Sequence, residues 1–250
     1  MELQLIRHAT LWLHYGGVQF LIDPMFSDQG ANPPIINSPN DRRNPLVPLP
    51  FDAVRLQKPD AVIVTHLHKD HWDEAAAALL DKATPVLCQP RDEIPLALDG
   101  FSSVTSINKQ LEFKGVTLIR TNGQHGTGEI GEKMGQVSGF VFKKEGEPTL
   151  YLAGDTIWCS DVLEALDAHR PDITIVNAGG ARFTVGDPIT MDADDVVAVS
   201  KHAPYTQMVA VHMDSINHCL VTKVDLRKRL AEEHLQHQVI VPEDGEKVLV

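Results

Sequence analysis

The stretch that decides the fold is Thr65-His66-Leu67-His68-Lys69-Asp70-His71. It follows an apolar run, residues 61–65, that is typical of a strand buried on both faces, and it precedes a predicted helix over 73–81. Imidazole and carboxylate groups are the ligands that divalent metals such as zinc prefer. An extended His-x-His pair points both rings to one side, and the turn into the helix carries the last two ligands to another position. One cation could not use all four groups, so the spacing predicts two metal ions.

Other ligand-type residues follow later in the chain. His125 lies in a glycine-rich loop after a predicted strand, whereas Asp155 and His212 each stand at the end of a short apolar run. In layered α/β folds, sites form where the carboxyl ends of strands meet. We therefore expect these three residues to join the first four. The alternative, a solvated loop that is rich in histidine by chance, does not account for ligand-type residues at several strand ends.

The predicted elements are rich in strands early in the chain and alternate strongly between strands and helices later, which indicates an α/β fold in one domain, residues 1–250. Gly16 and Gly17 predict a hairpin turn between strands over 11–15 and 18–22. Asp73 is the expected N-cap of the helix over 73–81. The other predicted strands are 86–88, 104–107, 116–121, 138–142, 150–153, 173–176, 208–211, 239–241 and 247–250. The other predicted helices are 161–169, 193–202 and 223–233.

Residues 24–50 have a different character, because seven prolines interrupt them and exclude regular structure. A loop of this length inside a compact domain is commonly functional. Two interpretations stay open at this point. The segment either borders the substrate pocket or wraps the domain without a role in binding.

Composition limits the partners of the protein. With 22 basic and 34 acidic residues, the formal net charge is −12, which disfavours nucleic acid as a partner. The three cysteines, Cys88, Cys159 and Cys219, are odd in number and lack CxxC spacing, which favours a reducing compartment and hence the cytoplasm. We expect no signal peptide and no membrane span. The oligomeric state stays open, with a homo-oligomer among the options.

An HxHxDH motif followed by a later His, an Asp and a final His resembles the metallo-β-lactamase superfamily. The resemblance implies an αββα four-layer sandwich, in which two mixed β-sheets lie face to face with helices outside. It implies that His66, His68 and His125 bind one metal ion, that Asp70, His71 and His212 bind a second, and that Asp155 bridges them. The two ions would be zinc, with manganese or iron as alternatives.

Shorter motifs are similar to one branch of that superfamily, the ascorbate-phosphate lactonases and N-acyl-phosphatidylethanolamine phospholipases D. They are Ile6-Arg7-His8-Ala9-Thr10, Leu21-Ile22-Asp23-Pro24 and the ending Pro242-Glu243-Asp244-Gly245-Glu246. The common β-lactamases carry a cysteine where Asp155 stands, and flavodiiron proteins carry a glutamate at the second histidine. Neither change is present here. The glycine that commonly follows the motif is replaced by Asp73, as in phospholipase-like members.

The expected chemistry is hydrolysis by a hydroxide that bridges the two ions. The bond would be an ester, a lactone or a phosphodiester in a small, anionic molecule. Asp70 would orient the nucleophile, and His8 or His218 would protonate the leaving group. Asp23 would hydrogen-bond a ligand histidine from outside. Arg42, Arg43 and Arg182 are candidates for binding an anionic group.

Two alternatives to a hydrolase stay open. Some proteins of this superfamily use iron at similar ligands to oxidise thiols or to reduce oxygen. The other alternative is a non-catalytic metal-binding module on the same fold. Iron content and colour would separate the first from a zinc or manganese hydrolase.

Overall fold

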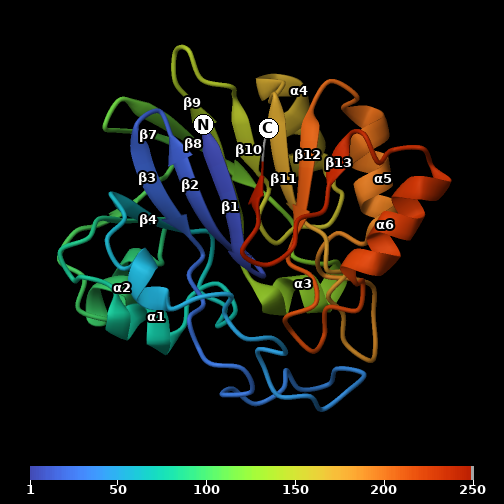
Figure 1. The fold of residues 1–250 in the computed structure, drawn as a ribbon, viewed down its shortest axis with the longest axis horizontal. Coiled ribbons are helices and arrows are strands. Elements are labelled where there is room, and N and C mark those ends of the chain that lie inside the picture. Colours follow the sequence, from blue (N-terminus) through green and yellow to red (C-terminus); the bar gives the residue numbers. More distant parts are fainter. Residues whose placement is uncertain (249–250) are drawn as a thin grey trace.

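The computed structural model of the protein describes residues 1–248, and its two sheets lie face to face (Figure 1). The first sheet has the strand order β14-β1-β2-β3-β4-β5-β6. Its strands are β1 (Glu2–Arg7), β2 (Thr10–Tyr15), β3 (Val18–Ile22), β4 (Ala61–Val64), β5 (Val86–Cys88), β6 (Val104–Ser106) and β14 (Lys247–Val248). Strands β14 to β3 pair antiparallel and β3 to β6 pair parallel, so the sheet is mixed.

The second sheet has the order β13-β12-β11-β10-β9-β8-β7 and is also mixed. Its strands are β7 (Gln110–Phe113), β8 (Val116–Asn122), β9 (Ser138–Lys143), β10 (Leu150–Leu152), β11 (Ile173–Asn177), β12 (Gln207–Val211) and β13 (Val239–Ile240). β7 to β10 pair antiparallel, and β10 to β13 pair parallel. The half of the sheet that follows β10 therefore has the parallel order that the alternation of strands and helices predicts.

Helices cover the outer faces of both sheets. The helices are α1 (Glu74–Leu79), α2 (Glu93–Leu98), α3 (Gly128–Met134), α4 (Ser160–His169), α5 (Ala193–His202) and α6 (Lys223–Glu232), with a 3-10 turn over Ala53–Leu56. One apolar cluster joins the facing sides of the two sheets through residues such as Phe20 and Phe140. A second packs α4, α5 and α6 on β10–β12, and a third packs α1 and α2 on β4 and β5. These layers confirm the predicted αββα sandwich.

Most predicted elements are confirmed within a residue or two. Asp73 is the N-cap of α1 and accepts a hydrogen bond from Ala76 N at 2.7 Å. α2, α3 and β7 were not predicted. Pro95 and the glycines of α3 lower the helix propensity of two of these segments, and β7 is a short strand at the edge of the sheet. The last strand predicted over 247–250 is described as far as Val248, and residues 249–250 lie outside the described residues.

Residues 24–50 form neither a helix nor a regular strand, as predicted, and lie at the lower end of the molecule in Figure 1. The buried guanidinium of Arg7 holds this proline-rich loop, because it donates hydrogen bonds to the carbonyls of Met25, Ser27 and Val47. Burial lowers the pKa of Arg7 to about 10, so the group stays charged at neutral pH. Among the described residues, no helix combines the length and the apolar character that crossing a membrane requires.

Candidate metal centre

The predicted ligands come from both sheets and meet at one end of the sandwich. His66 follows β4 and Asp155 follows β10, while His212, His125 and His8 follow β12, β8 and β1. These strands run in the same direction within their sheets, so their carboxyl ends share one edge. The amide of His212 donates to the carbonyl of His8 at 3.0 Å and joins the two sheets at this edge.

The first group of converging side chains is His66, His68 and His125. His66 Nε2 lies 2.9 Å from His68 Nδ1, which lies 3.3 Å from His125 Nε2. One nitrogen from each ring lies within 4.8 Å of the others, and His66 and His125 are buried. Three imidazole nitrogens that face one point are a donor set that suits a cation.

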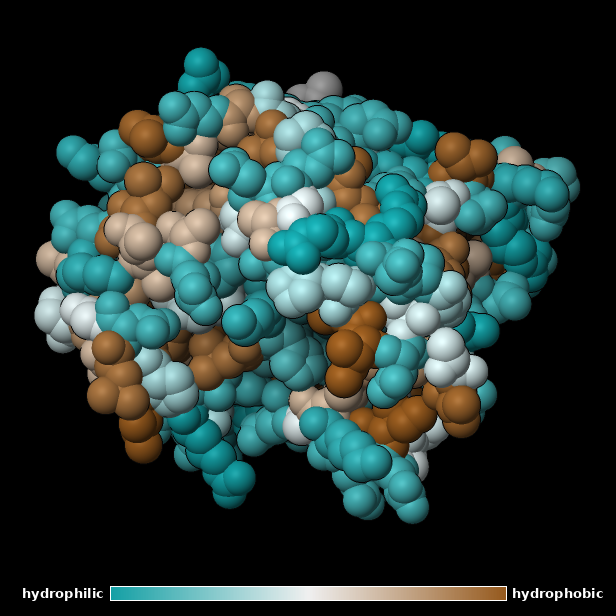
Figure 2. Space-filling view, turned by 90° about the horizontal axis from the view of Figure 1, so that it is seen from below, coloured by the Kyte–Doolittle hydropathy of each residue, from teal (hydrophilic) through white to brown (hydrophobic). Residues whose placement is uncertain are grey.

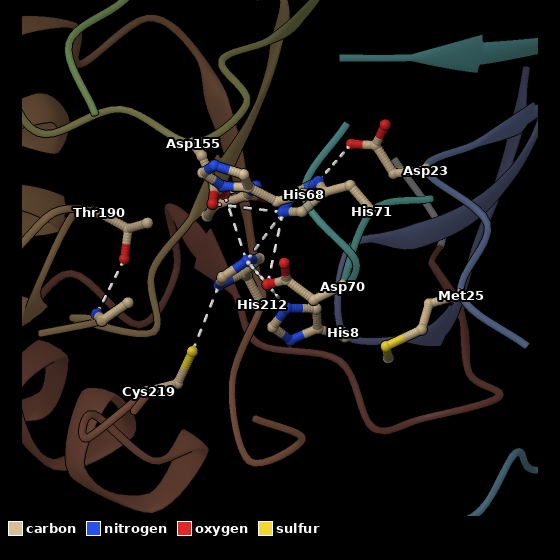
Figure 3. A network of polar contacts seen from close by, with 12 residues as sticks. His8, Asp23, Met25, His68, Asp70, His71, Asp155, Thr190, His212 and Cys219 are labelled. Atoms are coloured by element: carbon tan, nitrogen blue, oxygen red, sulfur yellow. Dashed lines mark hydrogen bonds and ion pairs between the residues drawn. The ribbon is translucent and has the colours of Figure 1, made fainter. Parts of the chain in front are cut away.

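The second group is Asp70, His71 and His212, and the structure adds His8 to it. His71 Nε2 and His212 Nε2 are 3.2 Å apart, and Asp70 Oδ2 lies 3.5 Å from His212 Nε2. His8 Nε2 lies 3.0 Å from Asp70 Oδ2, and its ring stacks on that of His212 with the centroids 3.6 Å apart. Figure 3 shows these rings and the Asp70 carboxylate turned toward one another. His8 thus lies inside the centre.

Asp155 lies between the two groups. Its Oδ2 is 3.5 Å from His125 Nε2 and 3.2 Å from His71 Nε2, and its Oδ1 is 3.2 Å from His212 Nε2. Asn177, at the end of β11, donates a hydrogen bond to Oδ1 at 2.6 Å and orients the carboxylate. A carboxylate has two oxygens and can serve two cations, whereas each histidine offers one nitrogen to one.

Outer hydrogen bonds hold the rings in position. His71 Nδ1 lies 2.8 Å from Asp23 Oδ2, and that carboxylate also accepts bonds from the amide and hydroxyl of Thr65. His125 Nδ1 donates to the carbonyl of Ile189 at 2.7 Å. In both histidines an acceptor at Nδ1 leaves Nε2 free to face the centre, which is how proteins fix the tautomer of a metal ligand.

The electrostatics of this buried cluster favour cations. Burial would raise the pKa of Asp155, but His212 and His71 hold it well below its usual value. Burial likewise opposes ionisation of Asp70, yet its histidine neighbours hold the pKa of that group well below normal. Burial and His71 lower the pKa of His66, so its ring is neutral and able to donate a lone pair. At His71 the opposite holds, because Asp155, Asp23 and Asp70 outweigh burial and raise the pKa of that ring well above its usual value. Ionised carboxylates that are removed from water and attract positive charge in this way match divalent cations.

Three residues of the centre have left-handed backbone conformations, with φ of 62° at His8, 44° at Asp23 and 71° at His212. Such values are uncommon outside glycine and cost on the order of 1 kcal/mol each. All three lie where a strand ends and the chain turns into the site. The surrounding fold therefore maintains strain in order to aim these side chains.

The remaining predicted residues lie in different places. His218 is buried, and its Nδ1 has no hydrogen-bond partner among the described residues. Burial lowers its pKa to about 4, and the charges of Asp70 and Asp155 oppose that shift. The guanidinium of Arg43 is bonded to the carbonyls of Gly30 and Ala31. The amide of Arg182 donates to the carbonyl of His218 at 3.0 Å, but no side-chain hydrogen bond or ion pair joins Arg42, Arg43 or Arg182 to the centre within the described part of the chain.

Sequence reasoning missed two residues that organise the site. Asn177 follows an apolar run, as the predicted ligands do, so its place at a strand end was a usable signal. Asn217 is buried and links two distant loops, because its side chain bonds to Ile35, Asn40 and Asn44. No periodicity or motif in the sequence marks that residue.

Replacing Asp23 with alanine is expected to weaken metal binding at the group that contains His71, by about 10-fold to 100-fold. The physical reason is that His71 loses the acceptor at Nδ1 that orients its ring. Competition titration with a chelating dye measures the affinity. Asp60→Ala is the control, since Asp60 is a distant carboxylate that accepts a bond from Gln19 N. Equal effects of the two substitutions would contradict this role for Asp23.

Comparison with known proteins places this geometry in context. Residues 19–213 match the model of the β-lactamase superfamily domain. UPF0173 protein YddR of Bacillus subtilis is 38% identical over 254 residues, which cover 98% of each chain. The crystal structure of an isothiocyanate hydrolase from Delia radicum gut bacteria is similar with a TM-score of 0.96 and 36% identity, covering 100% of this chain and 99% of the other. That of a possible metal-dependent hydrolase from Veillonella parvula has a TM-score of 0.97 and 35% identity, with the same coverage.

Proposed function

The chain is a metal-dependent hydrolase that belongs to the β-lactamase superfamily, and from this premise we propose that it works with two divalent cations. Zinc is the first candidate, and manganese and iron are the alternatives. The observation that carries the proposal is the position of Asp155, whose carboxylate lies 3.5 Å from His125 Nε2 in the first group and 3.2 Å from both His71 Nε2 and His212 Nε2 in the second. A site for one cation would not need a carboxylate between two sets of ligands.

The ligands divide as the two groups do. His66, His68 and His125 would hold one cation, and Asp70, His71 and His212 would hold the other, with Asp155 shared. When bound, the pair supplies a hydroxide nucleophile near neutral pH and polarises the bond under attack. The residues of the chain position these elements and keep the site shielded from bulk water.

Two further side chains have roles in this proposal. Asp70 orients the attacking water, and His8 fixes Asp70 through the contact of 3.0 Å at Nε2. His218 is the better candidate to pass a proton to the leaving group, because Asp70 already holds Nε2 of His8, while Nδ1 of both rings lacks a partner in the described structure. Burial keeps the His218 ring neutral near pH 7, so it would take a proton from the attacking water before it donates one. His8→Ala should therefore affect metal binding, and His218→Ala should affect turnover.

For the substrate, we propose the isothiocyanate group first, since a solved structure with that printed activity matches the whole chain. In this reaction the water oxygen bonds to the central carbon of R–N=C=S. The C–N bond then breaks and the nitrogen takes up protons, which yields the amine R–NH₂ and carbonyl sulfide. Esters, lactones and phosphodiesters, which the sequence motifs suggest, are the other substrate classes to test. A small molecule is the partner in each case.

We also propose the cytoplasm as the compartment, which the three unpaired cysteines support.

The binuclear proposal predicts close to two divalent ions for each chain at saturation. Plasma emission spectrometry of protein dialysed against zinc or manganese measures the ratio. Because the two groups share Asp155, we expect strong loss of the isothiocyanate, ester or lactone turnover when a chelator removes either ion. A ratio that stays near one at saturating metal would contradict the proposal.

The same preparations separate the other functions. Iron-loaded, coloured protein that consumes oxygen with a thiol substrate would favour an oxidoreductase. Protein that binds two ions but hydrolyses no member of the substrate panel would favour a non-catalytic module. Hydrolysis by zinc or manganese protein, with carbonyl sulfide released from benzyl isothiocyanate, is the expected result.

A further inference from the structure

A cavity of about 210 Å³ adjoins the metal centre on the side of Asp70. Its walls are mostly apolar and come from the proline-rich loop and from the loop after β12. The residues that form the apolar wall are Met25, Pro33, Pro34, Ile35 and Ile216. Met25 lies on the same side of the centre as Asp70 and His8 (Figure 3). We call this cavity the apolar pocket.

Among the described residues that line the apolar pocket, no basic side chain is buried. Lys69 lines it, but its side chain is 80% exposed and pairs with Glu74 at 3.5 Å. The nearby arginines are engaged elsewhere, because Arg43 binds the carbonyls of Gly30 and Ala31, and Arg7 binds those of Met25 and Ser27. Figure 2, which views this end of the molecule, shows hydrophobic side chains interspersed among hydrophilic ones.

Hydrogen bonds hold the loop walls in place. Asn217 accepts bonds from Ile35 N at 2.9 Å and from Asn44 Nδ2 at 2.8 Å, and it donates to the carbonyl of Asn40 at 3.0 Å. The amide of Leu46 also donates to the carbonyl of Ser215 at 2.7 Å. The loop therefore has a defined shape next to the centre, and the pocket is preformed.

We propose that the apolar pocket binds an uncharged, apolar substituent of the substrate, of the size of a benzyl or short alkyl group, beside the bond that is cleaved. This inference rests on the proposed hydrolase function for its catalytic part. An apolar cavity of about 150 Å³ binds benzene in another protein, so the volume here suffices for a phenyl ring. The inference departs from the expectation of an anionic substrate, because Arg43 binds loop carbonyls and no side-chain bond joins Arg42 or Arg182 to the centre in the described structure.

The first test is a series of isothiocyanates with methyl, propyl, benzyl and 4-carboxybenzyl substituents. We expect kcat/KM to rise by about fourfold for each methylene group that becomes buried. The 4-carboxybenzyl compound should react at least tenfold less efficiently than the benzyl compound. A kcat/KM that does not vary along the series, or that is highest for the carboxylate, would overturn the inference while leaving the hydrolase function intact.

Paired variants test the place of binding. Ile35→Trp fills the pocket, and the backbone of Ile35 can keep its bonds to Asn217. It should lower kcat/KM for the benzyl compound at least tenfold more than it lowers kcat/KM for the methyl compound. Ile36→Trp is the matched control, since Ile36 is 77% exposed in the same loop and does not line the pocket. Ile35→Arg should instead shift the preference toward the 4-carboxybenzyl compound. If Ile35→Trp and Ile36→Trp lower kcat/KM for the benzyl compound equally, the substituent does not bind in the apolar pocket.

Binding measured without turnover separates the two proposals. N-benzylformamide carries the same substituent without the reactive group, and 4-(formamidomethyl)benzoate is its anionic counterpart. Calorimetry with metal-free and zinc-loaded protein should show that the neutral probe binds and that Ile35→Trp weakens it at least tenfold. If both results are obtained while no substrate is hydrolysed, the assignment of the apolar pocket is supported and the hydrolase proposal fails. If the neutral probe does not bind, or binds equally to Ile35→Trp, the pocket assignment fails.

Discussion

Asp155→Ala is expected to remove both bound metal ions and to lower hydrolysis by several orders of magnitude. The carboxylate contacts His125 and His71 through Oδ2 and His212 through Oδ1, so its loss affects both groups of ligands at once. His212→Ala removes one nitrogen from one group and should weaken chiefly that group. Metal titration of both variants, together with kcat for the best substrate of the panel, measures the difference.

The fold should survive the loss of Asp155. A chain of 250 residues buries a large apolar core, and the cluster between the two sheets does not depend on the centre. Circular dichroism checks this point. Asp172→Ala is the matched control, because Asp172 is an exposed carboxylate at the other end of β11. If Asp155→Ala keeps two tightly bound ions and near-normal turnover, Asp155 is not the bridge.

Asn217→Ala is expected to lower the free energy of unfolding by about 3 kcal/mol, since each buried polar group left without a partner costs about 1–3 kcal/mol. The substitution leaves Ile35 N and Asn44 Nδ2 without their shared acceptor, and it removes the donor to Asn40 and Ser38. Urea unfolding of metal-free protein measures the change. Because the metal ligands are untouched, two ions should still bind.

The same variant should loosen the proline-rich loop. We expect limited proteolysis to cut within residues 24–50 faster than in the unmodified protein, and KM for the benzyl substrate to rise more than kcat falls. Gln29→Ala is the control in the same loop, since its bond to the carbonyl of Leu46 is exposed and should contribute less than 0.5 kcal/mol, a rough limit for surface changes. If Asn217→Ala and Gln29→Ala lower the free energy of unfolding equally, Asn217 has no special role in holding the proline-rich loop.

Much of the architecture followed from local patterns. The apolar run before His66, the hairpin at Gly16 and Gly17, and the alternation of strands and helices after residue 150 predicted the class and most elements. Their signal is local, because a strand that is covered on both faces must be apolar along its length. The helix α3 was not predicted, because its local sequence signal opposes the structure that forms. Two of its seven residues are glycine, so local propensity opposes a helix that the tertiary fold nevertheless forms.

The sequence by itself determined the chemistry of the centre, because ligand type and spacing are properties of the chain and HxHxDH places four donors within six residues. Only the tertiary structure decided which groups meet across the two sheets. It placed His8 against Asp70 over a separation of 62 residues, and it turned Arg43 to loop carbonyls and away from the substrate pocket. It also joined Asn217 to a loop more than 170 residues away. Such contacts depend on how the sheets and loops pack, and packing geometry between distant segments leaves no periodic trace in the order of residues.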